Sequence, residues 1–423
     1  MNRRVLIVSP HFPPVNAPDM QRVRVSLPYF VAAGWQVTVL TVADPTPTAP
    51  LDPELAATVP AAVRVVRAFC LSRRWTGLVG VNNVALRSLP FLFLAGCRLL
   101  SGRRHDVVYF STTMFIVLPL GRLWKALTGV PYVIDLQDPW ITDYYERPGA
   151  PRPPGGWKYR VAQGLGRALE GWTMRGVAHL IAVSQSYIDT LRTRHPQLRA
   201  TPAIELPFGS PDPDLALAAA RLKSRAPLLP AGGLRLAFAG ALGPGQLAAV
   251  EVFFAALAAA RRTGMQVSAH FFGTSYDPLA RPATLALAAQ YGLQDCVHES
   301  PARLRYFDAL QVSLEADANL LFGSTDLPFT PSKILTVLAT GRPVLALAPS
   351  GSALVTRLAQ LGQSCVTFPA AGSTETASGE AALQLRNLAA GRAGKSDLAA
   401  LKRHSAEAIA ARQMSVLQAA ATG

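Results

Sequence analysis

The sequence predicts an α/β chain of two doubly wound domains that face each other across a cleft. Short apolar runs of strand length alternate with helical segments, and this alternation occurs twice along the chain. A region rich in proline and glycine separates the two sets. The chain has 423 residues, of which 50% are hydrophobic and 16% charged, so it can form two folded cores. Alternating strands and helices imply parallel sheets with helices on both faces.

The first domain is expected over residues 1–205. Its predicted strands are the apolar runs at residues 5–9, 36–42, 106–110, 130–136 and 179–183. A helix is expected from Asp19 to Ala33, with Gly34 as its C-terminal stop.

The second domain is expected over residues 234–394, after a linker at residues 206–233 that holds one Ala-rich helix. A helical tail is expected at residues 395–423. The predicted strands of the second domain are residues 234–239, 267–272, 318–321 and 343–347, with a helix at residues 247–261.

The charge is strongly basic and unevenly distributed. There are 41 Lys and Arg against 26 Asp and Glu, a formal net charge of +15, and residues 1–205 alone carry +11. This excess favours a polyanionic partner, either an anionic membrane surface or a diphosphate-linked acceptor. Nucleic acid is disfavoured, because the sequence contains no helix-turn-helix, zinc-finger spacing or aromatic-basic RNA motif. The apolar residues 78–100, flanked by arginines, fit either a membrane interface or a buried helix with exposed arginines.

The cysteines and the hydropathy favour a cytoplasmic protein. None of the four cysteines forms a CxxC pair, and their apolar surroundings predict buried free thiols. No run reaches the ~18 uninterrupted apolar residues of a spanning helix. We therefore expect a cytoplasmic chain that is peripheral at the inner face of the membrane.

Several polar residues of the first domain follow predicted strands, where ligands of doubly wound sheets bind. Asp138 is the leading acid/base or sugar-orienting candidate, although it could instead cap a turn. His11 is a second acid/base candidate or a structural histidine. Arg22 could hold a diphosphate by a bidentate contact or lie on a solvated helix face. Asp135 and Asp143 lie near the same strand end and are weaker candidates.

Two segments of the second domain fit a phosphate-binding role. The loop with Gly240, Gly243 and Gly245 follows a strand, and its glycines would allow close approach to a phosphate, although a purely structural turn explains it equally well. The segment TPSKILTVLATGRPVLA, residues 330–346, predicts a turn, a short helix and a strand. The N–H groups near Ser332 and the charge of Lys333 would bind an anion at the helix start.

Four motifs together resemble a known family. They are SPHFPP…QRVR…LPYFVAAGWQVTVLT at residues 9–41, DVVYFSTTMF…LTGVPYVIDLQDPW at 106–140, HLIAVSQSYIDTL at 179–191 and TPSKILTVLATGRPVLA at 330–346. In this order they resemble retaining GT-B glycosyltransferases, specifically a bacterial subgroup that builds surface polysaccharides. The resemblance implies two Rossmann-like domains and transfer of a sugar from a nucleotide-diphosphate sugar to a saccharide acceptor, often lipid-linked.

The resemblance also implies site roles. The donor would be held by the second domain near Ser332 and Lys333, without a cofactor or a protein-bound metal. Thr336 stands where the family carries a ribose-binding glutamate, so it is grouped with the donor-binding residues. The acceptor would be held mainly by the first domain, and transfer would take place in the cleft.

Two other functions remain open at this stage. Thr336 replaces the family's glutamate, and Leu242 and Gln246 stand where the family has basic residues. These replacements fit a catalytically degenerate GT-B protein that binds saccharide or partners an active transferase. A nucleotide-sugar epimerase of the same fold is the other alternative.

Overall fold

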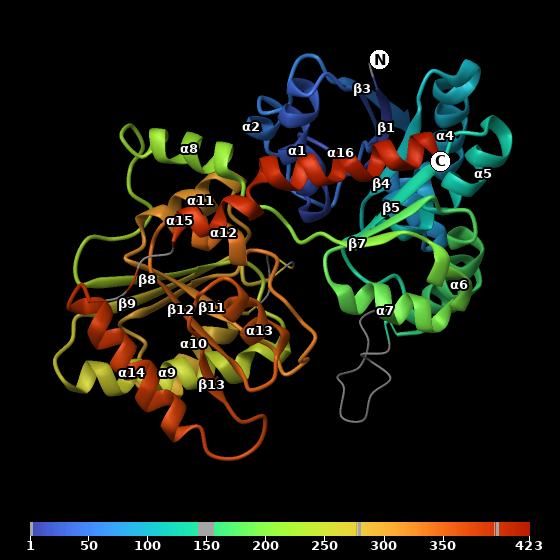
Figure 1. Ribbon diagram of the computed structural model, residues 1–423. Helices are drawn as coiled ribbons and strands as arrows, with labels where there is room; N and C mark the ends of the chain where they lie inside the picture. The colour runs from blue at the N-terminus through green and yellow to red at the C-terminus, as the bar shows by residue number, and fades with distance from the viewer. Residues whose placement is uncertain (1–2, 143–155, 276, 278–280, 393, 395–396) are drawn as a thin grey trace. The chain divides into compact units, whose positions relative to one another are not determined.

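The computed structural model describes residues 3–142, 156–275, 277, 281–392, 394 and 397–423 (Figure 1). The chain forms two compact units. Unit 1 comprises Met1–Gly209 together with Ala406–Gly423, and unit 2 comprises Ser210–Ser405. Each unit is described by itself.

Unit 1 is built on a seven-stranded parallel sheet of order β3-β2-β1-β4-β5-β6-β7. Its strands are β1 Arg4–Val8, β2 Gln36–Ala43, β3 Arg64–Phe69, β4 Val107–Ser111, β5 Tyr132–Leu136, β6 His179–Ala182 and β7 Ala203–Glu205. The central strands are almost fully buried because helices cover both faces.

The helices of unit 1 follow the strands. They are α1 Gln21–Ala32, α2 Pro53–Ala56, α3 Arg73–Thr76, α4 Val84–Leu100, α5 Pro119–Thr128, α6 Trp157–Met174, α7 Gln185–Arg194 and the C-terminal α16 Ala406–Thr422. One core packs α4 and α5 against the sheet, and another packs α1 and α16 against its other face. Figure 1 shows α16, in red, beside α1, in blue, although these helices lie at opposite ends of the sequence.

Unit 2 is built on a six-stranded parallel sheet of order β10-β9-β8-β11-β12-β13. Its strands are β8 Leu234–Ala239, β9 Val267–Phe272, β10 Val297–Ser300, β11 Ala318–Phe322, β12 Val344–Pro349 and β13 Val366–Phe368. Its helices are α8 Asp212–Arg221, α9 Leu247–Arg262, α10 Ala283–Gln290, α11 Tyr306–Glu315, α12 Ile334–Ala339, α13 Ala353–Gln360, α14 Glu375–Ala389 and α15 Leu398–Leu401. One core packs α9 and α14 on the sheet, and a second one packs α12 and α13. The two doubly wound α/β units predicted from the sequence are therefore confirmed.

The units divide the chain differently from the expected ranges. Unit 1 extends to Gly209 rather than residue 205, and the expected linker at residues 206–233 belongs mostly to unit 2. The expected tail at residues 395–423 is split, since its last helix supplies Ile409 and Leu417 to the core of unit 1. Within the described residues, no single helix is long and apolar enough to cross a membrane. One pair, Arg73–Val79 with Val84–Leu100, meets that test only jointly and is bent by 115°.

Candidate functional site

In unit 1, polar side chains meet where three neighbouring strands end. β1, β4 and β5 are adjacent and parallel, so the loops after their carboxyl ends meet at one edge of the sheet. Nδ1 of His11 lies at hydrogen-bond distance, 2.9 Å, from Oδ1 of Asp19. The Thr112 hydroxyl donates to Oδ2 of the same carboxylate, also at 2.9 Å. Gln137 donates to the backbone oxygen of Asp19 at 2.8 Å. Asp19 thus connects the polar side chains that lie at this edge of the sheet.

The buried carboxylate of Asp19 orients and charges His11. Burial acts to lower the pKa of His11, but the hydrogen bond and charge of Asp19 outweigh it, so the pKa is raised. Nε2 of His11 has no recorded partner within the described part of the chain. An imidazole held through Nδ1 with Nε2 free is the arrangement of a general acid or base.

Asp138 follows β5 at the same edge. The residue is exposed at the surface of unit 1. The surrounding protein nevertheless removes its carboxyl partly from water, and this desolvation, together with the nearby negative charge of Asp19, raises the pKa of Asp138 to about 6. Such a carboxyl changes its charge near neutral pH, which suits an acid/base group. The predicted pair His11 and Asp138 therefore shares one sheet edge, with Asp19 acting on both.

Arg22 is committed to a buried ion pair. Its Nε donates to Oδ2 of Asp135 at 2.5 Å, and its remaining nitrogens donate to the backbone oxygens of Leu206 and Pro207. Tyr109 and Ser111 also donate to Oδ2 of Asp135. Arg22 is 5% exposed. Its assignment as a diphosphate ligand stays a prediction, and in this structure the guanidinium stabilises unit 1 instead.

In unit 2, the glycine loop lies between neighbouring strand ends. The Gly240 N–H donates to the oxygen of Phe272, which ends β9, and the Gly245 oxygen accepts from Thr325 after β11. A Cβ on Gly245 would lie 2.4 Å from Oγ of Ser324, so a larger residue there would require Ser324 to shift. Gln246 closes the loop, because its side chain accepts from Gly243 N–H and donates to the oxygen of Phe322. The basic residue expected at Gln246 is thus replaced by one that shapes the loop.

Lys333 lies against this loop. Its Nζ donates to the backbone oxygen of Ala239, lies 4.5 Å from the centre of the Phe238 ring, and occupies the space that a Cβ on Gly240 would need. Burial and the like charge of Arg303 lower the pKa of Lys333 to about 7. The two donor-binding candidates Gly240 and Lys333 are therefore in direct contact.

The helix after Lys333 starts one residue later than the sequence predicts. α12 begins at Ile334, and Lys333 is its N-cap, so its side chain returns to the end of β8. Ser332 is exposed in the preceding turn, and Thr336 is half-buried within α12. A bound anion would therefore meet the Lys333 side chain and the Gly240 loop rather than a long helix dipole.

Two residues that act on the candidate groups are not indicated as site residues by the sequence. The sequence marks Asp19 only as a helix start, yet its carboxylate holds His11, eight residues earlier. Arg303 follows β10, an edge strand that the sequence did not predict. The weaker candidate Asp143 lies outside the described residues.

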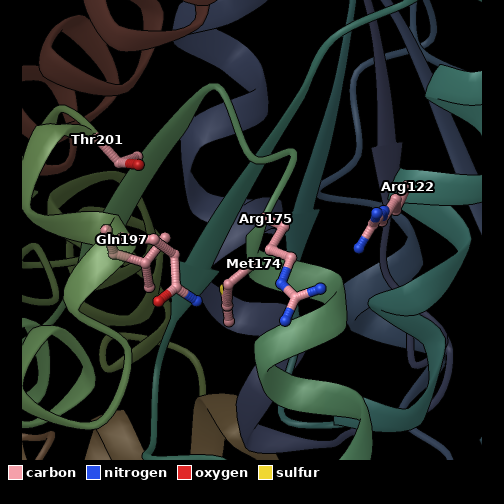
Figure 2. Close-up of a pocket in the computed structure, with 6 residues that line it drawn as sticks. Arg122, Met174, Arg175, Gln197 and Thr201 are labelled. Atoms are coloured by element: carbon pink, nitrogen blue, oxygen red, sulfur yellow. The ribbon is translucent and has the colours of Figure 1, made fainter.

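A basic hollow lies at the opposite edge of the unit 1 sheet (Figure 2). It measures about 540 Å³, and its lining includes Arg122, Arg175 and Thr201. Arg175 and Thr201 lie before the amino ends of β6 and β7, away from His11 and Asp138 at the carboxyl ends. Within the described residues, no group of three or more His, Cys, Asp or Glu is arranged to hold a metal ion.

Solved structures with this architecture define the fold. A glycosyltransferase from Rickettsia africae ESF-5 superposes with a TM-score of 0.60 at 13% identity, covering 99% of this chain and 98% of that one. Anabaena Alr3699/HepE in complex with UDP gives 0.58 at 15% identity, covering 99% and 100%. WaaG, a glycosyltransferase involved in lipopolysaccharide biosynthesis, gives 0.60 at 15%, covering 98% and 99%. The chain therefore has the two-unit α/β fold of GT-B glycosyltransferases.

One family model matches part of the sequence. Residues 21–209 match the model of the glycosyl transferase 4-like domain, and the match spans most of unit 1. A search of curated proteins found no match.

Proposed function

We propose that the chain is a glycosyltransferase that moves a sugar from a nucleotide-diphosphate sugar to a saccharide acceptor. The observation that carries the proposal is the contact between Lys333 and the Gly240 loop at the strand ends of unit 2. It provides a cation beside backbone that can approach a phosphate closely. In unit 1, His11 with Asp19, and Asp138, would activate or orient the acceptor hydroxyl.

The relatives support a nucleotide-bound donor. HepE was solved with UDP, and its fold is shared at full length. The diphosphate would accept from Lys333, and Arg303 would add charge from the loop after β10. Ser332 and Thr336 would lie near the ribose or phosphates. We expect hexosyl transfer of the retaining type that needs no protein-bound metal.

The acceptor is proposed to be lipid-linked, within the synthesis of a bacterial cell-surface polysaccharide. The basic excess of the first 205 residues favours an anionic acceptor or membrane surface. WaaG, which shares the fold, acts in lipopolysaccharide biosynthesis. The chain would then work at the cytoplasmic face of the membrane.

Thermal-shift and calorimetric titration with nucleoside diphosphates and their sugars tests donor binding. Lys333→Met keeps the apolar stem and removes the charge, so we expect affinity to fall about 10- to 100-fold, as for a lost hydrogen bond to a charged group. Lys223→Met is the matched control, because Lys223 is exposed elsewhere in unit 2.

Release of nucleoside diphosphate on adding acceptor extracts, followed with and without chelator, tests transfer and the absence of a metal. A protein that binds no nucleotide sugar, or binds it equally well after Lys333→Met, would overturn the proposal. Tight binding without turnover on any extract would support the degenerate alternative.

A further inference from the structure

Three large apolar side chains stand in solvent at one turn of unit 1. Trp75 is 75% exposed, Leu78 81% and Val79 78%. They lie on α3 and the single turn of 3-10 helix that follows it, Gly77–Val79, and are called here the apolar tip. Exposing this much apolar surface is unfavourable in water, so the tip points to a partner that covers it.

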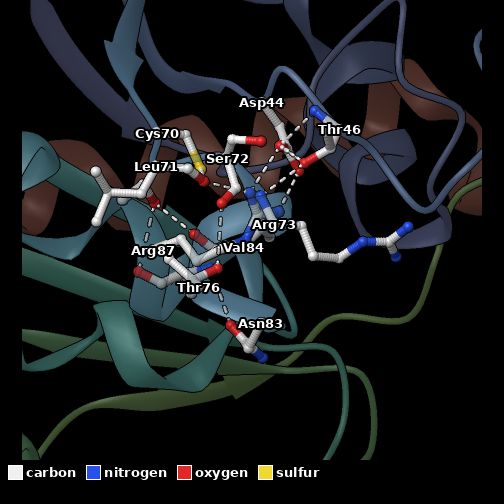
Figure 3. Close-up of polar contacts among 12 residues, drawn as sticks. Asp44, Thr46, Cys70, Leu71, Ser72, Arg73, Thr76, Asn83, Val84 and Arg87 are labelled. Carbon is white, nitrogen blue, oxygen red and sulfur yellow. Dashed lines mark hydrogen bonds and ion pairs between the residues drawn. The ribbon is translucent and has the colours of Figure 1, made fainter. Parts of the chain in front are cut away.

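The base of the tip is rigidly held by polar contacts (Figure 3). Arg87 is buried and donates to both carboxylate oxygens of Asp44, at 2.9 and 2.5 Å. It also donates to the backbone oxygen of Leu71 at 2.6 Å. Ser72 caps α3 by accepting from the N–H of Arg74. These contacts connect the segment before the tip to the end of β2 and to α4.

The neighbouring helix α4 does not leave unit 1. Leu92, Leu99 and Leu100 of α4 belong to the core that packs on the sheet. The other exposed apolar side chains of this bent pair are Leu86 and Leu94 of α4, at 42% and 52%, and they are less exposed than the three of the apolar tip. Residues 78–100, which the sequence marked as one apolar stretch, thus divide into a tip and a core helix.

The arginines near the tip favour an anionic partner. Residues 55–104 contain eight arginines and no acidic residue, and seven arginines remain once Arg87, which is buried and paired with Asp44, is set aside. Arg73 and Arg74 directly precede Trp75, and both are exposed. Apolar side chains with arginines at their rim match the layering of a bilayer, in which anionic headgroups surround an apolar interior.

The tip also lies at the carboxyl ends of the strands of unit 1, which is the side of the sheet that holds the candidate site. It follows the carboxyl end of β3, and the site residues His11 and Asp138 follow the carboxyl ends of β1 and β5 in the same parallel sheet. A surface docked through the tip would therefore adjoin the site edge of unit 1.

We propose that the apolar tip inserts Trp75, Leu78 and Val79 into the interface of an anionic lipid bilayer, with Arg73 and Arg74 against the headgroups. The insertion presents the site edge of unit 1 to the membrane. Delivery of a lipid-linked acceptor to that edge rests on the proposed function, whereas lipid binding does not.

Flotation of the full chain with vesicles tests the proposal. Vesicles of phosphatidylcholine with one-third phosphatidylglycerol are compared with pure phosphatidylcholine at 0.1 M salt. We expect binding to the anionic vesicles only, and a loss of more than tenfold in the Trp75→Ala/Leu78→Ala/Val79→Ala variant. Arg73→Gln/Arg74→Gln should weaken binding by about fivefold per arginine, with a shallower salt dependence. Leu127→Ala is the control, since Leu127 is 64% exposed on α5.

Each outcome decides the proposal. Equal binding by the triple variant and the wild type, or binding that ignores lipid charge, overturns it. The proposal is also overturned if light scattering shows a concentration-dependent dimer that is lost in the triple variant while vesicle binding is unchanged. An unchanged melting temperature and nucleotide titration in the triple variant separate loss of the tip from unfolding and from any failure of the donor site.

Discussion

The two units place charge at their strand ends in opposite ways. In unit 1, the charges of Arg22, Asp135 and Asp19 are buried and paired with the unit's own side chains and backbone, although Oδ1 of Asp135 accepts no hydrogen bond from the described residues. In unit 2, the described residues give the Lys333 ammonium a backbone oxygen and an aromatic face, and the nearby charge of Arg303 has the same sign. An edge with paired charges suits holding reacting groups in place, whereas an edge with a cation that has no carboxylate partner suits binding an anion. The comparison thus favours the proposed division, with positioning in unit 1 and anion binding in unit 2.

The largest effect is expected from breaking the buried pair of unit 1. Asp135→Asn leaves the Arg22 charge buried and unpaired, which should cost about 3–5 kcal/mol of unfolding free energy. Urea denaturation followed by tryptophan fluorescence measures the loss. Asp106→Asn is the matched control, because its ion pair with Arg4 is hydrated at the surface and should matter far less. Equal losses in both variants would contradict the positioning role.

Removal of the Asp138 carboxylate should act on turnover rather than on donor binding. Asp138→Asn is expected to lower kcat about 100-fold, the usual scale for an acid/base group. In the wild type, kcat should rise with pH through about 6, as the carboxyl ionises. Because this folded pKa lies above the ordinary value, the carboxyl's contribution to stability should fall as pH rises from about 4 to about 6. A flat profile between pH 5 and 7 would contradict the assignment.

A methyl group at Gly240 should break the anion site of unit 2. In Gly240→Ala the new Cβ would displace the Lys333 ammonium, so nucleotide affinity should fall by about tenfold or more, close to the effect of losing the charge itself. Gly292→Ala is the control, since Gly292 shares a positive φ and has open space around it. Titration calorimetry on both variants measures the difference. Tight binding by Gly240→Ala would mean that the anion does not use Lys333.

The smallest effect is a pH dependence of donor affinity. Lys333 loses its proton near pH 7 in the free protein, and a diphosphate would favour the charged form. Affinity should therefore fall above pH 7, by up to about tenfold per pH unit, with proton uptake on binding. Calorimetry in buffers of different ionisation enthalpy counts the proton, and Lys333→Met should abolish the uptake.

Ionisation of Lys333 should change the stability of the fold in the opposite direction from donor affinity as pH rises. The folded pKa is depressed, so between about pH 7 and 10.5 the unfolded chain binds the extra proton, and this group's contribution to stability rises with pH.

The sequence predicted the central strands and missed the edges. β1, β4, β5 and β11 are buried almost throughout and are mostly apolar in sequence. The missed strands are β3, β7, β10 and β13, and they are the four sheet edges. They are partly exposed or very short, so local apolarity does not reveal them.

The candidate site could be predicted only in part, for a related reason. The sequence locates the strands that precede the candidate residues Lys333, Gly240, His11 and Asp138, so it predicts at which end of each sheet they lie. The partner that holds each group comes from elsewhere in the chain, as Asp19 does for His11. The structural role of Arg22 in unit 1 depends on the backbone oxygens of Leu206 and Pro207, more than 180 residues away, which no local pattern indicates.

The C-terminal helix α16 makes unit 1 the last part of the chain to be completed. Its Gln413 donates to the Tyr109 hydroxyl, which in turn donates to Asp135, so the buried network closes only when this helix is in place. During synthesis, the ribosome must first produce roughly 200 residues of unit 2, which takes about 10–40 s at 5–20 residues per second. Unit 2 is continuous and can fold during that interval, whereas unit 1 needs α16 beside α1 to complete the cover on one face of its sheet. Completion of unit 1 therefore has to follow the synthesis of unit 2.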